Sequence, residues 1–336
     1  MSDPVETFEV RVHYPLERGR MVLRCELDWE RDLEAVASSD SEARFRVPAP
    51  KAFLYFKPVI REGSKLHWSK GPNYLALATE GREVYPYFFA DEGCSACELR
   101  ELAVPGNGRV HRYRVFYPPG YHENVLRRYP VLYMHDGHNL FFPDEASYGR
   151  HWEVTETLGV LDQMNALEQV IVVGVHPNER EREYTWPGYE AYGRFLVQAL
   201  KPAIDASFRT RPEAAATAVM GSSLGGVASL HLAWQWPEVF GQAACLSSTF
   251  GWRDDLAERI ESQERRAIKL YLDSGWPEDN FEATRAMRGR LRRRGFTEGR
   301  DLLYLAFPRA RHDERHWALR AHIPLQFFFG AGNAGS

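Results

Sequence analysis

The segment AVMGSSLGGVASLHLA, residues 218–233, places Ser223 at the centre of a Gly-x-Ser-x-Gly motif between two apolar runs. This spacing is typical of a nucleophilic serine on a sharp turn from a strand into a helix, where glycines remove Cβ atoms that would clash. The adjacent Ser222 falls at a variable position of the motif, so we expect it to support the turn rather than to react. A serine hydroxyl is protonated at neutral pH, so the chemistry also requires a base and a group that orients that base.

Two histidines follow the last apolar run of the chain, in the segment AFPRARHDERHWALRA. His312 comes first, in the loop that should follow a strand, where an imidazole can reach back over the sheet. It is therefore the predicted general base. His316 is expected inside the next helix. Together the two could bind a metal only with a third ligand, which this segment does not offer.

The acid that orients the base is expected in the segment IKLYLDSGWPEDNFE, which contains three candidate carboxylates. Asp279 lies deepest in the loop and is ranked first, although it could instead cap the helix expected from Phe281. Glu278 is ranked second. Asp273 is third, because it falls at the end of the strand-like run, where it could simply fix the turn. The residues alone leave this choice open.

Negative charge develops on the substrate oxygen during attack on an ester, so backbone N–H groups must point at that oxygen. One such amide should come from Leu224, the residue after the nucleophile. The segment YPVLYMHDGHNLF suggests the second, because a turn at its glycine could present the amide of His138. The alternative interpretation of this segment is an ordinary β-turn, since Asp-Gly is a frequent turn pair.

Aromatic side chains near these segments could hold a ring of the substrate. Trp152, Tyr184 and Trp276 are the candidate walls for an aromatic or sugar ring, since loops at this end of a sheet line the cleft. The chain contains nine tryptophans, so a role in the core is at least as reasonable for any one of them.

The first 105 residues contain short alternating or aromatic runs separated by turn residues, and a helix is suggested only at residues 29–37. Runs rich in β-branched and aromatic residues are typical of strands. They predict a small all-β domain over residues 1–105, a sandwich of immunoglobulin type.

From residue 106 to residue 336, strand-like apolar runs alternate with helix-like segments. Apolar strands that feed helices predict a mostly parallel sheet covered by helices on both faces. In such sheets the chemistry gathers at the carboxyl ends of the strands. The helices with the clearest patterns are expected at residues 154–166, 192–207, 227–236 and 281–294.

The composition is that of an ordinary globular protein, with 44% hydrophobic and 26% charged residues and a formal net charge of −4. This charge gives no reason to expect nucleic acid or an anionic membrane as a partner. The start, MSDPVETFEV, does not have the pattern of a signal peptide, and no apolar run approaches a membrane span, so we expect a cytoplasmic protein. Cys94 and Cys97 have Cys-x-x-Cys spacing, but no second pair follows, so two reduced thiols are expected rather than a zinc site.

Taken together, these segments resemble the putative-esterase branch of the α/β-hydrolases, which contains enterochelin esterase, feruloyl esterases, S-formylglutathione hydrolase and bacterial mycolyltransferases. The resemblance spans about residues 112–330. It rests on RYRVFYPPGY, VLYMHDGHNLF and FRTRPEAAATAVMGSSLGG, and on His312-Asp313 with Trp317 five residues after the histidine.

The resemblance implies an α/β-hydrolase domain preceded by a β-sandwich, as in enterochelin-esterase-like proteins and some carbohydrate esterases. It implies Ser223 as nucleophile, His312 as general base, and the amides of His138 and Leu224 as the oxyanion hole. The implied substrate is a small-molecule or carbohydrate-linked ester, with an acyl-enzyme intermediate and no metal or organic cofactor. The loop GWPED is one residue longer than the usual family spacing, so Glu278 and Asp279 both remain open.

Two other functions fit the sequence less well. An acyltransferase of mycolyltransferase type would replace water by a sugar hydroxyl, which the expected cytoplasmic location disfavours. A glycan-binding protein with an inert esterase-like half is disfavoured because the serine, histidine and acid are all present.

Overall fold

The computed structural model describes residues 7–48, 52–77, 81–90, 98–103 and 108–330. The chain folds into two compact units. The first contains Met1–Cys94, Pro118–Arg128 and Asp162–Asn165, and the second contains Ser95–Tyr117, Tyr129–Leu161 and Ala166–Ser336. The Cys94–Cys97 pair and the predicted boundary at residues 105 and 106 lie outside the described residues.

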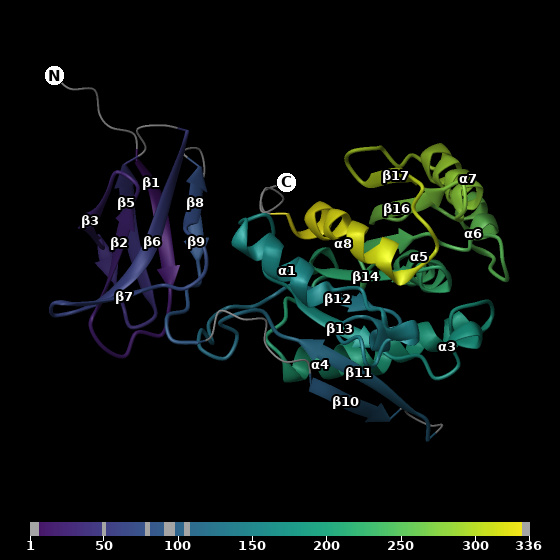
Figure 1. The fold of residues 1–336 in the computed structure, drawn as a ribbon, viewed down its shortest axis with the longest axis horizontal. Coiled ribbons are helices and arrows are strands. Elements are labelled where there is room, and N and C mark those ends of the chain that lie inside the picture. The colour runs from purple at the N-terminus through teal and green to yellow at the C-terminus, as the bar shows by residue number, and fades with distance from the viewer. Residues whose placement is uncertain (1–6, 49–51, 78–80, 91–97, 104–107, 331–336) are drawn as a thin grey trace. The chain divides into compact units, whose positions relative to one another are not determined.

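The first unit consists of two β-sheets, with strand orders β4-β5-β1-β9 and β3-β2-β6-β7, and β8 pairs with β6 (Figure 1). The strands are β1 Thr7–His13, β2 Arg20–Cys25, β3 Asp28–Glu34, β4 Ala37–Ser38, β5 Glu42–Pro48, β6 Phe53–Glu62, β7 Lys65–Trp68, β8 Tyr74–Leu77 and β9 Arg82–Val84. The helix suggested at residues 29–37 is wrong. This segment forms β3 and β4, because antiparallel pairing of β3 with β2 outweighs a weak local pattern.

Buried and exposed residues alternate along the strands of this unit, and the buried ones form its core. Val10 on β1 lies opposite Phe45 on β5, and both side chains are fully buried. The same cluster includes Leu23 from β2 and Phe56 from β6, which belong to the other sheet. One apolar core therefore lies between two sheets, since inward-facing residues with period two leave each sheet one buried face.

Later parts of the chain complete the first unit. The Glu123 carboxylate accepts hydrogen bonds from the amides of Phe88, Phe89 and Ala90 at 2.6–2.9 Å, and from the Tyr14 hydroxyl at 2.9 Å. The amides at residues 88–90 are thus satisfied by a side chain more than thirty residues further along the chain.

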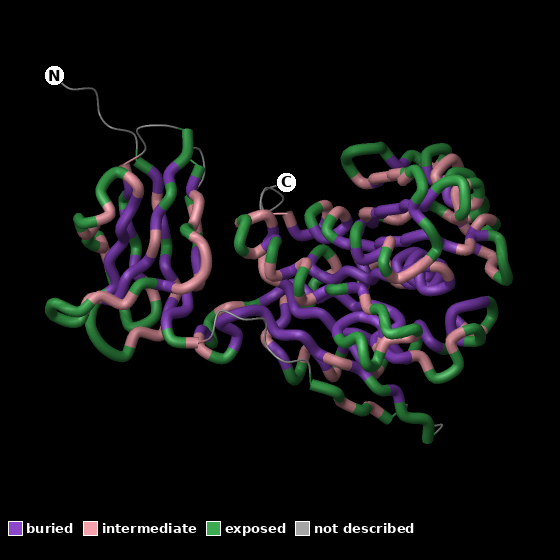
Figure 2. The backbone as a smooth tube through the Cα atoms, in the orientation of Figure 1, coloured by how far each residue is buried: buried purple, intermediate pink, exposed green. Residues whose placement is uncertain are grey.

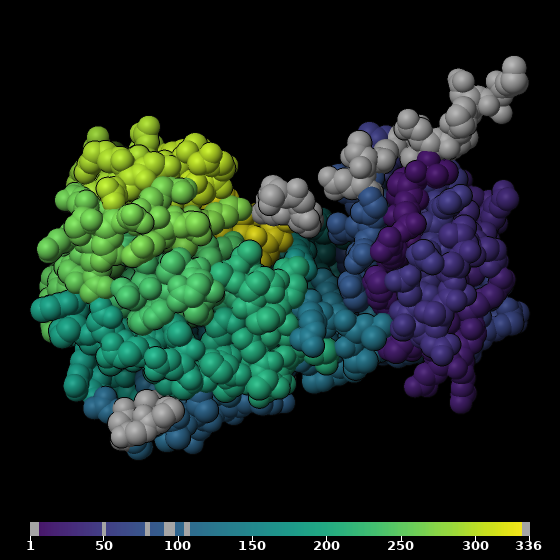
Figure 3. All heavy atoms as spheres, turned by 180° about the vertical axis from the view of Figure 1, so that it is seen from behind, coloured from purple at the N-terminus to yellow at the C-terminus, as the bar shows by residue number. Residues whose placement is uncertain are grey.

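The second unit is built on one eight-stranded sheet of order β10-β11-β13-β12-β14-β15-β16-β17 (Figure 1). Its strands are β10 Glu98–Ala103, β11 Val110–Phe116, β12 Val131–Met134, β13 Ile171–Val175, β14 Thr217–Ser222, β15 Gln242–Leu246, β16 Lys269–Trp276 and β17 Leu302–Pro308. Strands β12 to β17 run parallel, and β10 and β11 add antiparallel pairs at one edge. Seen from behind, the blue edge and the yellow-green edge of this unit lie at opposite ends (Figure 3).

Helices cover the sheet, and the central strands are buried along their whole length (Figure 2). The helices are α1 Val154–Gln163, α2 Arg180–Glu183, α3 Gly188–Phe195, α4 Lys201–Ser207, α5 Leu224–Gln235, α6 Leu256–Ser262, α7 Phe281–Arg293 and α8 Glu314–Phe329. A π-helical turn, Leu196–Leu200, joins α3 to α4. Helices α1 and α8 pack into one apolar cluster with β12, β14 and β15, and every residue of α5 from Leu224 to Trp234 is buried. Among the described helices, none has both the length and the apolar character needed to cross a membrane.

Candidate active site

Ser223 lies on the turn between β14 and α5, as its motif predicts. Its φ and ψ angles are 56° and −122°, a conformation that a residue with a side chain rarely adopts. The backbone holds it there: the amide of Ser223 donates to the carbonyl of Leu246 at 2.9 Å, and its carbonyl accepts from Gly226 at 3.2 Å. Strain of this kind persists only where the surrounding structure enforces it, and it gathers at functional sites.

The motif glycines allow the close approach that this turn requires. A Cβ built on Gly221 would lie 2.7 Å from the carbonyl of Gly225 and 2.9 Å from the His135 ring. The clash would be with backbone, which cannot rotate away. The helix can therefore start directly above the strand only if residue 221 is glycine.

We expect Gly221→Ala to lower the free energy of unfolding by about 1–3 kcal/mol, because α5 must move away from β14 to make room. Gly289→Ala is the matched control, since a Cβ at Gly289 in α7 would meet only the end of the Arg293 side chain at 3.6 Å. That change should raise the free energy of unfolding by about 0.5–1 kcal/mol. Urea unfolding measures both, and equal effects of the two variants would contradict this account of Gly221.

The three predicted catalytic residues follow strands whose carboxyl ends meet at one edge of the sheet. Ser223 follows β14, Asp279 follows β16 and His312 follows β17. These strands lie in the order β14-β15-β16-β17, and all pairs between them are parallel. Parallel strands end at the same edge, so side chains from segments far apart in the sequence gather there.

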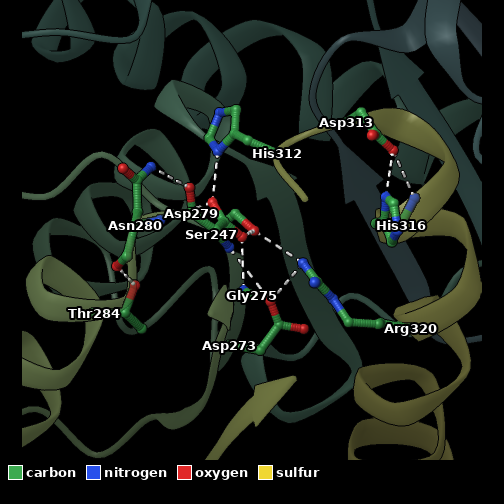
Figure 4. A network of polar contacts seen from close by, with 10 residues as sticks. All are labelled: Ser247, Asp273, Gly275, Asp279, Asn280, Thr284, His312, Asp313, His316 and Arg320. Atoms are coloured by element: carbon green, nitrogen blue, oxygen red, sulfur yellow. Dashed lines mark hydrogen bonds and ion pairs between the residues drawn. The ribbon is translucent and has the colours of Figure 1, made fainter. Parts of the chain in front are cut away.

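His312 contacts Asp279 directly, with 2.7 Å between Nδ1 of the imidazole and Oδ1 of the carboxylate (Figure 4). The histidine side chain is 35% exposed, whereas the carboxylate is fully buried. The other two candidate acids lie elsewhere. Glu278 lies at the surface, 3.9 Å from the guanidinium of Arg311, and Asp273 is buried beneath the edge of the sheet.

Four donors surround the Asp279 carboxylate. Oδ1 receives His312 and the amide of Asn280, and Oδ2 receives the hydroxyl of Ser247 and the amide of Gly275. Burial alone would raise the pKa of Asp279, but these hydrogen bonds outweigh it and lower the pKa to about 2. The carboxylate therefore stays negatively charged at neutral pH, as a group that orients an imidazole must.

Ser223 is joined to this pair through the backbone. Its amide donates to Leu246, and the following residue, Ser247, donates its hydroxyl to Asp279. Among the described residues, no hydrogen bond joins the Ser223 hydroxyl to His312. In enzymes without substrate, catalytic hydrogen bonds are often long and tighten only when the substrate binds.

His316 points to a different partner. Its Nδ1 lies 2.8 Å from Asp313, which also caps the start of α8 by accepting from the amide of His316 at 3.0 Å. His312 and His316 therefore each contact their own aspartate (Figure 4). Within the described ranges, no group of three or more His, Cys, Asp or Glu side chains could hold a metal ion.

The loop with His138 forms a short 3-10 turn, Gly137–Asn139, directly after β12. Asp136 starts the turn in the left-handed conformation, with φ 55°, and two contacts fix it there. Its amide donates to the Tyr184 hydroxyl at 3.1 Å, and its carboxylate accepts two hydrogen bonds from Arg180 at 2.7 and 2.9 Å. A Cβ on Gly137 would lie 2.5 Å from the carbonyl of Gly174, so the loop lies tightly against β13.

Leu224 is the first residue of α5. The first amides of a helix have no carbonyl partner within it, so they are free to bind an anion. The predicted pair of oxyanion donors thus comes from a helix start and from a loop fixed by charged contacts.

The three predicted aromatic walls have different environments. Trp152 is 2% exposed and packs in the core, 5.8 Å from the ring of Trp317. Tyr184 is fully buried and uses its hydroxyl on Asp136. Both side chains are buried in this structure, so their contact with a substrate ring stays a prediction. Trp276 is 50% exposed at the end of β16.

Sequence reasoning missed the residues that hold the acid in place. Ser247 follows β15 at the same edge of the sheet, and its position after a buried apolar strand was the available signal. Arg320 lies on α8 and had no such signal, because its partner is 73 positions away in the chain. Arg180, which holds the loop before His138, was likewise hidden in a charged segment.

Comparison with known proteins bears on the same region. Residues 107–319, more than half of the chain, match the family described as "Putative esterase". A curated relative, the uncharacterized protein YbbA of Bacillus subtilis (strain 168), is 23% identical over 245 residues, covering 65% of this chain and 92% of the relative.

Solved structures show the same fold. A ferulic acid esterase matches 70% of this chain and 98% of its own, with a TM-score of 0.59 and 16% identity. The enterobactin esterase FES from Shigella flexneri matches 98% of this chain and 94% of its own, with a TM-score of 0.59 and 15% identity. The second match extends over both units. The chain therefore belongs to the family described as "Putative esterase", and it is an enzyme that hydrolyses carboxylic esters.

Proposed function

We propose that the protein is a serine hydrolase in which Ser223 attacks the ester, His312 acts as general base and Asp279 orients His312. The observation that carries this proposal is the 2.7 Å contact between His312 Nδ1 and the buried Asp279 carboxylate, at the edge of the sheet where the strained Ser223 lies. A nucleophile, a base and an orienting acid from three separate loops are the parts that this chemistry requires.

The reaction proceeds in two halves. Ser223 Oγ bonds to the ester carbonyl carbon while its proton passes to Nε2 of His312, and the amides of Leu224 and His138 bind the oxyanion. The C–O bond to the alcohol then breaks, and the alcohol leaves with the proton from His312. Water, deprotonated by His312, then attacks the acyl carbon. The bond to Ser223 Oγ breaks, His312 returns the proton to Oγ, and the acid is released.

Asp279 stabilises the charged form of His312 during both halves. Its carboxylate remains ionised because hydrogen bonds outweigh its burial and keep its pKa at about 2. The negative charge of Asp279 beside Nδ1 keeps the imidazole proton on Nδ1. This tautomer leaves Nε2 free to accept the serine proton.

We also propose a fold for each part of the chain. The parallel strands β12 to β17 with covering helices support an α/β-hydrolase fold for residues 106–336. The two sheets that share a core support an immunoglobulin-like sandwich for residues 1–105. The first unit nevertheless also uses Pro118–Arg128, and β10 belongs to the sheet of the second unit, so the structural division is not a single cut.

We propose a small-molecule or carbohydrate-linked ester as substrate, with an aromatic ring in contact with Trp276. Two observations support this. Trp276 is half exposed, and its backbone carbonyl accepts from the amide of Arg309 at 2.7 Å, on the loop that leads to His312. The structural similarity to a ferulic acid esterase and to the enterobactin esterase FES also supports an ester with an aromatic ring.

A fluorophosphonate probe tests the proposal, because it reacts only with an activated serine. We expect one adduct per chain, located on Ser223 by peptide mass spectrometry, and much slower labelling of His312→Ala. Ser222→Ala is the control and should label at the wild-type rate. An adduct on Ser222 would move the nucleophile to that residue. An unlabelled protein would contradict the assignment of an activated serine nucleophile.

A further inference from the structure

Ser247 is connected to its surroundings through every polar atom it has. Its amide donates to the carbonyl of Asp273 at 2.8 Å, and its carbonyl accepts from the side chain of Asn280 at 2.8 Å. Its hydroxyl contacts both Asp279, at 2.5 Å, and Arg320, at 2.8 Å. The residue is fully buried. Figure 4 shows its hydroxyl between Asp279 and Arg320.

The direction of the two hydroxyl contacts follows from chemistry. A guanidinium has only donors, so Ser247 Oγ must accept from Arg320 Nη2. An ionised carboxylate has only acceptors, so the single hydroxyl proton goes to Asp279 Oδ2. Arg320 therefore donates a hydrogen bond to Ser247, and Ser247 donates one to Oδ2 of Asp279. His312 contacts Oδ1, the other oxygen of the same carboxylate.

Ser247 also has an unfavourable backbone. Its φ angle is 46°, in the left-handed region that side chains other than asparagine and aspartate seldom adopt. Glycine would adopt this conformation with less strain, but glycine has no hydroxyl. A serine at position 247 therefore provides a hydroxyl group at the cost of backbone strain.

Arg320 and Asp273 are a buried ion pair. The two side chains are 4% and 0% exposed, and Arg320 Nη2 lies 3.1 Å from Asp273 Oδ1. The Tyr271 hydroxyl donates to the other carboxylate oxygen at 2.8 Å, and the arginine head lies 5.2 Å from the ring of Phe307. Burial of two charges is seldom stabilising compared with apolar side chains of the same size. The pair therefore calls for a reason other than stability.

We propose that Ser247, held by the buried Arg320–Asp273 pair, is a positioning residue that fixes the Asp279 carboxylate for His312. This inference rests on the proposed function, in which Asp279 orients the base. Arg320 determines where the Ser247 oxygen lies, and Ser247 then fixes one oxygen of Asp279 so that the other faces Nδ1 of His312. Ser247, Asp273 and Arg320 are all buried. We therefore expect them to act on the rate only through the orientation of Asp279.

Ser247→Gly tests the proposal, because it removes the hydroxyl and relieves the backbone strain. For p-nitrophenyl acetate we expect kcat to fall by about tenfold to a hundredfold, while KM changes less than about twofold. The melting temperature should stay close to that of the wild type. Ser248→Ala is the matched control: Ser248 is equally buried, and its hydroxyl has no partner among the described residues. This control should keep the wild-type kcat.

A cycle of variants tests the connection to Arg320. The double variant Asp273→Asn/Arg320→Met removes both buried charges and replaces them with uncharged side chains. It should lower kcat, and combining it with Ser247→Gly should give no further loss, because both act through one carboxylate. Losses that multiply would overturn the connection between Arg320 and Ser247.

Two outcomes distinguish this inference from the proposed function. If Ser223→Ala is inactive while Ser247→Gly keeps the wild-type kcat, the positioning role is wrong and the proposed function stands. If Ser223→Ala retains activity, the proposed function itself fails. The proton nuclear magnetic resonance signal of His312 Nδ1–H gives an independent readout: we expect it to shift in Ser247→Gly and to stay in place in Ser248→Ala. An unshifted signal in Ser247→Gly would also refute the positioning role.

Discussion

Replacing Ser223 by alanine is expected to reduce kcat for p-nitrophenyl acetate by about 10⁴- to 10⁶-fold, since no other group can form the acyl-enzyme. Binding and the oxyanion amides would remain, so a small residual rate above that of water is expected. The fold should be unchanged, because the constrained turn is held by backbone contacts of Ser223 with Leu246 and Gly226 that alanine can also make.

Ser222→Ala is the control for this experiment. Ser222 ends β14 and is 2% exposed, so its substitution removes the neighbouring hydroxyl while Ser223 keeps its own. Activity comparable to that of the wild type is expected. Loss of turnover in Ser222→Ala with full turnover in Ser223→Ala would reverse the assignment.

The second large effect concerns the acid. Asp279→Asn is expected to lower kcat by about 10⁴-fold, because the amide carries no charge and favours the wrong tautomer of His312. All four neighbours of this carboxylate donate hydrogen bonds, so the NH₂ group of asparagine would also face a donor. Some loss of stability is therefore expected with the loss of rate.

Glu278→Gln provides the comparison one residue away. Its side chain is 74% exposed and lies 3.9 Å from Arg311, so neither rate nor melting temperature should change. Steady-state kinetics and thermal unfolding of both variants measure the difference. A large loss of rate in Glu278→Gln, with Asp279→Asn unaffected, would show that the loop adopts another arrangement during turnover.

The parallel part of the sheet was predictable because its strands are buried on both faces. The apolar runs at β12 to β15 are continuous, and every residue in them is buried. The edge strand β10 was not predicted. Its sequence, ELRELA, carries charges on a solvent-exposed edge, so it lacks the apolar pattern on which the other strands were recognised.

The positions of the candidate site residues were predictable where they depend on the order of elements along the chain. Ser223 was predicted from its glycines, and His312 from its place after the last strand. The contacts around Asp279 were not, since Ser247 and Arg320 reach it only after β15 and α8 have packed. Residue type was also a poor guide to exposure, because Trp152 and Tyr184 fill the core while Trp276 remains half exposed.

The Glu123 carboxylate has a consequence for how the protein is made. The amides of Phe88, Phe89 and Ala90 belong to the first unit, but their acceptor lies on a segment that follows β10 and β11. A ribosome releases residues in order, so the amino-terminal sandwich cannot finish folding before strands of the next sheet have emerged. A gene fragment that stops near codon 105 would therefore encode a sandwich without the carboxylate that accepts these three hydrogen bonds.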